Sequence, residues 1–145
     1  MASKTPKYAG FWIRFVAYII DSFVSQILLI ILVLPVILLF GNQNPAGMLQ
    51  VAVIFYALFA MAAVWLAYYV YAESSSWQAT FGKMFLGMKV TDLKGKRISF
   101  TRSLGRNLAK ILSALIVYIG YIMIGFTKKK QGLHDMLAGT LVIKK

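Results

Sequence analysis

Hydrophobic residues form two long runs, 11–40 and 48–71, separated by a short polar segment without charged side chains. Each run exceeds the roughly 20 apolar residues with which an α-helix crosses a bilayer. The pattern therefore predicts two antiparallel transmembrane helices joined by a turn at 41–47. A third hydrophobic element covers about 103–126. Its uninterrupted apolar part, 111–126, would be only about 24 Å long as a helix, which is short for a span.

Two arrangements of this third element are open. A full third span would place the lysines at 128–130 and at 144–145 on the outer side, against the positive-inside rule. A re-entrant or broken hairpin with Gly120 at its turn would keep these lysines on the same side as the N-terminus. We favour the broken hairpin, and hence an all-α membrane fold of two transmembrane helices plus a third shorter, re-entrant or spanning helical element.

The loop between the second and third hydrophobic elements is strongly basic, with seven Lys or Arg residues and one acid, Asp92, over 77–107. By the positive-inside rule we expect this loop and the N-terminus to be cytoplasmic. Alternating residues at 89–92 and 97–100 predict a small cytoplasmic β-hairpin, with Gly95 at a turn position that requires positive φ.

Three further short elements are expected around this hairpin. The segment 81–88 is predicted to be a short amphipathic piece on the membrane surface, and 131–138 a turn followed by a short helix. Residues 139–143 are predicted to be a brief strand that joins the cytoplasmic hairpin. Ser99 or Thr101 is expected to cap the helix of the third element.

Polar residues interrupt the first half of the first run at helical spacing. Arg14, Tyr18, Asp21, Ser22 and Ser25 fall on one helix face, whereas every residue after Gln26 up to Phe40 is apolar. A charged side chain inside a membrane helix is costly and marks a functional or structural site. This polar stripe is therefore the primary candidate site.

The two charges of the stripe are expected to have different partners. Helical side chains lean toward the N-terminus, so Arg14 points away from Asp21, which lies about 10 Å further along the axis. We expect Asp21 to meet Arg106 or Lys110. Arg14 is expected to meet Asp135 if the segment that contains Asp135 folds back under the helices.

The remaining charges have simpler interpretations. Arg102, Arg106 and Lys110 form a basic stripe, interpreted first as an anchor for lipid phosphates and alternatively as part of an internal polar site. Glu73, at the end of the second run, is expected to be a solvated carboxylate at the membrane interface.

Composition supports a single membrane domain over 1–145. The chain is 60% hydrophobic, with a net charge of +12 and no cysteine, and its mean hydropathy is +0.74. This hydrophobicity exceeds that of a soluble domain. Because the basic residues flank apolar runs, we expect them to face a bilayer with anionic headgroups rather than nucleic acid. The few, scattered acids predict no metal site, and no cofactor is expected.

Three motifs resemble the RDD family of small prokaryotic integral membrane proteins, named for an Arg and two Asp. They are AGFWIRFVAYIIDSFV, QATFGKMFLGMKV and KKQGLHDMLAGTLVI, and they occur in order between residues 9 and 143. The resemblance assigns the named positions to Arg14, Asp21 and Asp135. It implies a multi-pass protein of a prokaryotic cell membrane, for which transport of unknown ligands or cation/proton exchange has been suggested.

Two functions therefore compete. In the first, an intramembrane Asp/Arg site with Asp21 as the exchanging carboxylate performs transport or ion exchange; two spans and a partial third cannot enclose a pathway, so this requires a homo-oligomer. The alternative is a non-transporting accessory or scaffold protein that binds a larger membrane partner and whose Arg/Asp network is structural. An enzyme is not expected: His134 precedes Asp135, but no Ser or Cys nucleophile is predicted beside them. A hydrogen-bonding role of His134 is preferred.

Overall fold

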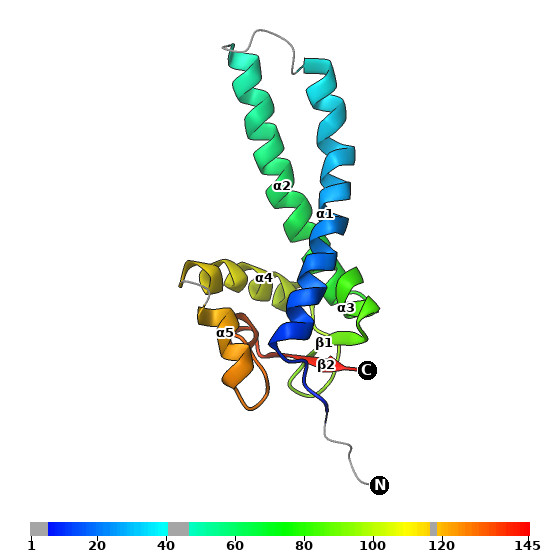
Figure 1. The fold of residues 1–145 in the computed structure, drawn as a ribbon, viewed down its shortest axis with the longest axis vertical. Helices are drawn as coiled ribbons and strands as arrows, with labels where there is room; N and C mark the ends of the chain where they lie inside the picture. Colours follow the sequence, from blue (N-terminus) through cyan, green and yellow to red (C-terminus); the bar gives the residue numbers. More distant parts are fainter. Residues whose placement is uncertain (1–5, 41–46, 117–118) are drawn as a thin grey trace.

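The computed structural model describes residues 6–40, 47–116 and 119–145. Two long helices, α1 (Phe11–Phe40) and α2 (Met48–Ser74), form an antiparallel hairpin that extends far beyond the rest of the chain (Figure 1). Both are long and apolar enough to cross a membrane. The prediction of two transmembrane helices in a hairpin is confirmed.

The remaining elements gather around the basic end of this hairpin, and we call them the platform. They are α3 (Phe81–Phe85), β1 (Met88–Asp92), α4 (Phe100–Leu115), α5 (Ile119–Phe126), α6 (Leu133–Leu137) and β2 (Thr140–Lys144). Helix α4 runs crosswise to the hairpin, and the C-terminus lies on the platform side (Figure 1). The hydroxyl of Ser99 caps α4 by accepting a hydrogen bond from the Arg102 N–H, as predicted for this position.

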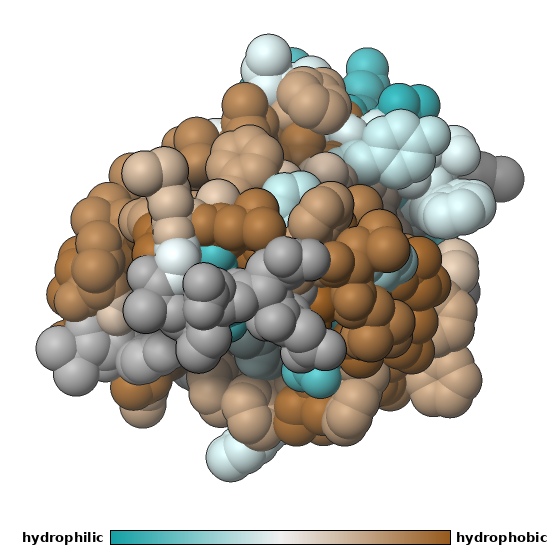
Figure 2. Space-filling view, turned by 90° about the horizontal axis from the view of Figure 1, so that it is seen from above, coloured by the Kyte–Doolittle hydropathy of each residue, from teal (hydrophilic) through white to brown (hydrophobic). Residues whose placement is uncertain are grey.

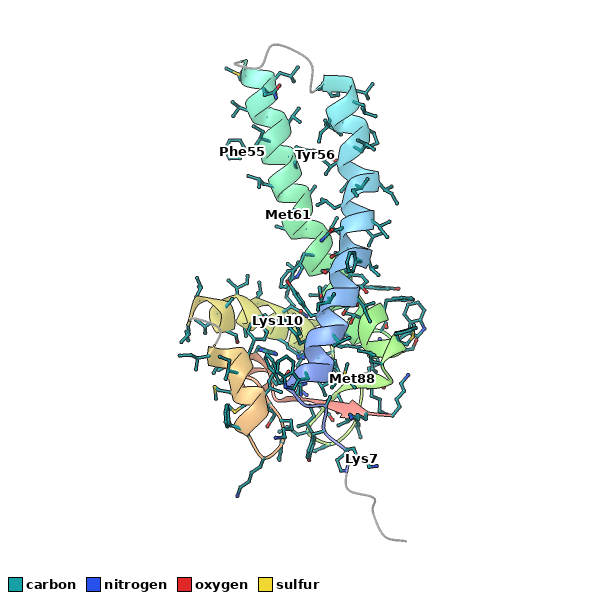
Figure 3. All side chains as sticks on the ribbon, viewed as in Figure 1. Lys7, Phe55, Tyr56, Met61, Met88 and Lys110 are labelled. Carbon is teal, nitrogen blue, oxygen red and sulfur yellow. The ribbon has the colours of Figure 1, made fainter. Side chains whose placement is uncertain are left out.

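The outer part of the hairpin makes few contacts with the rest of the chain. Only 6% of the most apolar window of α1 and 11% of that of α2 are buried. Viewed from the end of the hairpin, the surface is mostly apolar (Figure 2). Phe55 projects outward, whereas Tyr56 lies between the helices and donates a 3.4 Å hydrogen bond to the Leu32 carbonyl (Figure 3). This surface is suited to lipid chains or to another membrane helix.

The third hydrophobic element is bent rather than straight. The axes of α4 and α5 differ by 102°, so the broken arrangement is confirmed. Gly120 was expected at the turn, but it lies within α5, where a Cβ would come 2.7 Å from the Cβ of Ser113. Its role is therefore close packing of α5 against α4. The break itself includes 117–118, outside the described residues.

The strand expected at 139–143 is present as β2, but it takes the place of the one expected at 97–100. β1 pairs antiparallel with β2, with Val90 opposite Val142, whereas the residues at 97–100 form no described strand. The turn at 92–96 is as predicted, with Gly95 at φ +78°. β2 also bonds the N-terminal tail, where the Lys144 N–H donates to the Lys7 carbonyl at 2.8 Å. The C-terminus is thus on the same side as the N-terminus.

The apolar core of the platform lies between the start of α1 and the sheet. It is formed by apolar side chains from three separate parts of the chain: Ala9, Ala17, Met88, Val90, Ile98 and Val142. Because these residues come from both ends of the sequence, the core joins the chain termini to the base of the hairpin. Beside it lies a group of buried charged residues.

Candidate functional site

Glu73, at the C-terminal end of α2, is the centre of a buried ion network. Its carboxylate is fully buried and forms ion pairs with Lys83 of α3 and with Arg106 of α4, the latter at 2.5 Å. Lys110 lies 3.5 Å away, and the side-chain amide of Asn107 donates at 3.2 Å. The expectation of a solvated Glu73 is wrong, because α3 and α4 close over the end of α2 and replace water with three cations.

Asp135, on α6, is the second acid of the network. Arg106 Nε donates to one carboxylate oxygen at 2.8 Å, and Arg14 Nη1 pairs with the other. The backbone N–H of Gly132 adds a 3.3 Å contact. Arg106 therefore bridges Glu73 and Asp135, and the expected meeting of Arg14 with Asp135 is confirmed. Together, the two acids connect α1, α2, α3, α4 and α6.

Arg14 also fixes two backbone segments. Its Nε donates to the carbonyl of Ala9 at 2.9 Å, and Nη2 donates to the carbonyl of Lys130 at 2.5 Å. The planar guanidinium, with its fixed fork of donors, can satisfy three acceptors at once. A lysine has no such geometry, so Arg14→Lys would not be conservative here.

Asp21 forms a separate polar site. It accepts hydrogen bonds from the Thr80 hydroxyl at 2.5 Å, the Gly82 N–H at 2.6 Å and the Tyr68 hydroxyl at 2.9 Å. The expectation that Asp21 meets Arg106 or Lys110 is wrong. These basic side chains point to Glu73, and the donors to Asp21 come instead from the start of α3 and from Tyr68 of α2.

Gly82 allows α3 to approach α1 closely enough for this contact. A Cβ at Gly82 would come 2.3 Å from the Ala17 carbonyl oxygen and 3.0 Å from the carboxylate of Asp21. No side chain larger than hydrogen fits without displacing α3. The Gly82 position in the QATFGKMFLGMKV motif is thereby explained by packing.

The basic stripe of α4 divides into two parts. Arg106 and Lys110 are buried, and Lys110 Nζ also lies 4.4 Å from the ring centroid of Tyr69. Arg102 remains exposed and lies 4.0 Å from Asp92. The interpretation as a phosphate anchor is therefore wrong for Arg106 and Lys110, for which the alternative of an internal polar site holds.

Burial and ion pairing act against each other in this network. Burial lowers the pKa of Lys83 despite the opposing attraction of Glu73. Burial would raise the pKa of Asp135, but Arg106 and Arg14 outweigh it and hold that pKa well below its usual range. Asp135 therefore stays ionised at neutral pH. Among the described residues, no group of three His, Asp or Glu side chains is arranged to hold a metal ion.

His134 lies beside the network, and burial lowers its pKa to about 3. Its Nδ1 is 3.3 Å from the hydroxyl of Ser113, and its Nε2 is 3.6 Å from Asp135. A serine thus does lie beside this pair, contrary to the sequence expectation. Ser113 is fully buried, however, and its hydroxyl donates to the Ala109 carbonyl of its own helix. Its contact with His134 holds α6 against α4.

The other residues of the predicted stripe stay outside the network. Tyr18 is 56% exposed, and the hydroxyls of Ser22 and Ser25 donate to carbonyls of their own helix, those of Ile19 and Ser22. Sequence analysis missed Glu73, Lys83 and the donors to Asp21. The sequence did contain one indication that Glu73 is paired: it is one of only four acids in a chain with 16 Lys and Arg residues.

Comparison with known proteins identifies the family of this chain. The family model described as "RDD family" matches residues 8–139. The chain is 37% identical to the uncharacterized protein YxaI of Bacillus subtilis, covering 96% of this chain and 99% of that protein. It is 32% identical to the uncharacterized membrane protein YteJ of the same organism, covering 96% and 82%. No solved structure matches significantly.

A shorter match, 44% identical, covers 45% of this chain and 36% of the uncharacterized protein RP437 of Rickettsia prowazekii. The matched residues include Arg14, Asp21 and Asp135. In the structure, Arg14 pairs with Asp135, whereas Asp21 lies in a separate polar site. This chain is an integral membrane protein that belongs to the RDD family.

Proposed function

We propose that this chain is a non-catalytic accessory or scaffold protein of a prokaryotic cell membrane, in which the ion network holds the platform rigidly below a two-helix anchor. The main support for this proposal is that the two buried acids, Glu73 and Asp135, are both paired with basic side chains. Each is engaged by at least two cations, from helices far apart in sequence. Removing one partner from such a buried network is strongly destabilising, which suits a permanent connection better than a site that must release its ligand.

The exposed apolar flanks of the hairpin support a partner-binding role. Leu38 on α1 and Phe59 on α2 are 70% and 74% exposed. In a membrane, association between helices depends on packing and polar contacts rather than on hydrophobicity. A larger membrane protein, or a second copy of this chain, is the expected partner for these flanks.

Photo-crosslinking in native membranes tests this proposal. Benzoylphenylalanine at Leu38 or at Phe59 should give one dominant crosslink, identified by mass spectrometry as the same larger membrane protein from both positions. Leu93, exposed on the platform turn, is the matched control and should not give this product. Self-crosslinks alone would instead indicate a homo-oligomer that acts by itself.

Transport, including cation/proton exchange, is the second candidate, and one observation favours it. Of the acids that the structure describes, Asp21 is the one without an ion pair within 4.0 Å, although it is fully buried in the first span. Its donors are two hydroxyls and a backbone N–H. Protonation would remove an acceptor from these donors and loosen α3 from α1, a coupling that a carrier could use.

Flux measurements separate the two candidates. A carrier in liposomes should move Na⁺ or K⁺ against a pH gradient, and Asp21→Asn should abolish this flux while the protein stays folded. Flux that survives the substitution would remove Asp21 from the mechanism. The absence of flux in wild-type oligomers would leave the scaffold proposal as the better account.

We further propose that the platform is cytoplasmic, because the basic residues follow the positive-inside rule. The chain has no cysteine, so single substitutions report accessibility cleanly. Met48→Cys, at the far end of α2, should react with an impermeant thiol reagent on intact cells. Lys145→Cys should react only after permeabilisation. The opposite pattern would reverse the orientation.

A further inference from the structure

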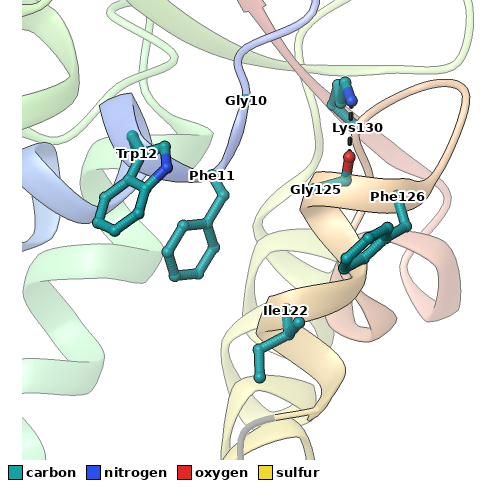
Figure 4. A pocket seen from close by; sticks show the side chains of 7 residues that line it. All are labelled: Gly10, Phe11, Trp12, Ile122, Gly125, Phe126 and Lys130. Carbon is teal, nitrogen blue, oxygen red and sulfur yellow. Dashed lines mark hydrogen bonds between the residues drawn. The ribbon is translucent and has the colours of Figure 1, made fainter.

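A groove lies between the start of α1 and helix α5, next to the ion network but separate from it (Figure 4). Its volume is about 420 Å³, within the range of about 300–1,000 Å³ that is typical of small-molecule sites. The lining residues come from both walls and from the loop after α5: Gly10, Phe11, Trp12, Ile122, Gly125, Phe126 and Lys130.

The walls of the groove are aromatic and apolar. Trp12 is 75% exposed and Phe126 86% exposed, and Phe11 packs edge-to-face against Trp12 with ring centroids 5.4 Å apart. Trp side chains, such as that of Trp12, gather at membrane–water interfaces, where the apolar part of the ring meets hydrocarbon. The groove lies at the basic end of the hairpin, where such an interface is expected, so its walls suit an acyl chain.

The rim of the groove is basic at Lys130, whose side chain and backbone are both fixed by hydrogen bonds. Three consecutive lysines, Lys128–Lys130, follow α5, and the lining includes no acidic residue. Lys130 Nζ donates to the carbonyl of Gly125 at 2.7 Å (Figure 4), and its own carbonyl accepts from Arg14 at 2.5 Å. An ammonium group has three donors, so Lys130 retains donors for an anion while Arg14 fixes its backbone.

We propose that this groove binds one anionic phospholipid, with an acyl chain against Trp12, Ile122 and Phe126 and the phosphate at Lys128–Lys130. Charge complementarity selects the headgroup, and the apolar walls select a lipid over free phosphate. Arg14 acts as a positioning residue, because it joins the Lys130 turn to α1 and to Asp135. Lipid binding at the groove would therefore depend on the contacts that Arg14 makes in the ion network. This inference does not depend on whether the protein is a scaffold or a carrier.

Fluorescence quenching tests the proposal in the intact chain. In a Trp65→Phe, Trp77→Phe background, Trp12 is the only tryptophan. The protein is reconstituted in phosphatidylcholine vesicles with brominated phosphatidylglycerol or, separately, brominated phosphatidylcholine at the same mole fraction. Phosphatidylglycerol should show at least about fivefold preference for the site near Trp12, since one lysine near an anionic surface suffices for that ratio.

Two sets of lysine variants locate the headgroup. Lys128→Gln with Lys129→Gln removes two exposed charges and leaves Lys130 intact, so the preference should fall to less than half of its value in the parent protein, with the remainder due to Lys130. The matched control, Lys94→Gln with Lys96→Gln, removes the same charge from the β1 turn, which does not line the groove, and should leave the preference unchanged.

Three outcomes would overturn the proposal. Equal quenching by the two brominated lipids in the parent protein would show that the groove does not select anionic lipid. An unchanged preference in the 128/129 variant would place the headgroup elsewhere. An equal loss in the control variant would show that overall surface charge, rather than this site, attracts the lipid.

Discussion

The two ends of the hairpin differ in the contacts that hold α1 beside α2. At the outer end, the helices are apolar on all sides and remain largely exposed. At the platform end, the same helices carry Arg14, Asp21 and Glu73, each buried and each bonded to a different element. Hydrophobicity therefore places the hairpin in the membrane, whereas polar contacts determine which elements meet.

The difference follows from the solvent on each side. Apolar side chains gain no hydrophobic free energy by leaving lipid for one another, so the outer half imposes little specificity. A buried carboxylate, in contrast, has a large desolvation cost unless its partners are in place. The platform should therefore be sensitive to single polar substitutions, and the outer hairpin should tolerate apolar ones.

The largest effect is expected from Arg106→Gln. This substitution removes the cation shared by Glu73 and Asp135, leaves both acids short of a partner, and should lower the free energy of unfolding in detergent by about 3–5 kcal/mol. The control is Arg102→Gln, one turn earlier on α4 and exposed, which should change stability by less than about 1 kcal/mol. Equal effects at both positions would mean that Arg106 is not buried in a network.

Acidification should be the next strongest perturbation. Burial lowers the pKa of His134 from 6.5 to about 3, so the unfolded chain binds the proton first and stability falls as the pH drops below 6.5. The slope approaches about 1.4 kcal/mol per pH unit well below pH 6.5, so the loss between pH 6.5 and 4.5 is about 2 kcal/mol. Asp135, whose pKa is also lowered, adds to the loss only below about pH 4.

Thermal unfolding of wild type and His134→Gln across this pH range measures the contribution of the histidine. The variant should lose most of the slope between pH 6.5 and 4.5. A slope that persists unchanged in the variant would assign it to other groups.

A smaller effect is expected from Gly82→Ala. The added Cβ would lie 2.3 Å from the Ala17 carbonyl oxygen, so α3 must move away from Asp21, at a cost of about 1–3 kcal/mol. Gly105→Ala is the matched control: no atom lies within 4 Å of a Cβ there. Alanine within α4 should be neutral or stabilising by up to about 1 kcal/mol. If the two variants were equally stable, the close approach of α3 to α1 would be refuted.

The smallest effect is expected in the outer hairpin. Phe59→Ala on α2 removes a 74% exposed ring and should change the unfolding free energy in detergent by no more than about 0.5 kcal/mol. Val70→Ala on the same helix removes two buried methyl groups at a site that is 2% exposed, and should cost about 1.5 kcal/mol. If Phe59→Ala lowered the unfolding free energy as much as Val70→Ala, the side chain of Phe59 would have to be packed against the rest of the protein.

Much of the fold could be predicted from sequence because hydropathy and turn chemistry are local. The two spans, the broken third element, the cap at Ser99 and the turn at Gly95 all depend on residues that are close in the chain. The strand β2 was also expected, but its direct pairing with β1 was not, because β2 lies almost fifty residues later in the chain and pairing over that distance leaves no local pattern.

The site could be predicted only in part. Arg14 and Asp135 were recognisable because they match the RDD motifs, and the geometry brings them together. Glu73 was misplaced because a single acid at the end of a span has the same local sequence whether it is solvated or covered. The donors to Asp21 were missed because two are neutral hydroxyls and one is a backbone N–H, which carry no charge signal.

A double-mutant cycle on Arg14 and Asp135 tests the central claim, that the RDD residues form a buried ion pair joining the first span to α6. Unfolding free energies in detergent are measured for wild type, Arg14→Gln, Asp135→Asn and the double variant. For residues in contact within one network, we predict a coupling energy of about 1.5–3 kcal/mol. Additive effects within about 0.5 kcal/mol would contradict the account, because they would mean that the two side chains do not interact.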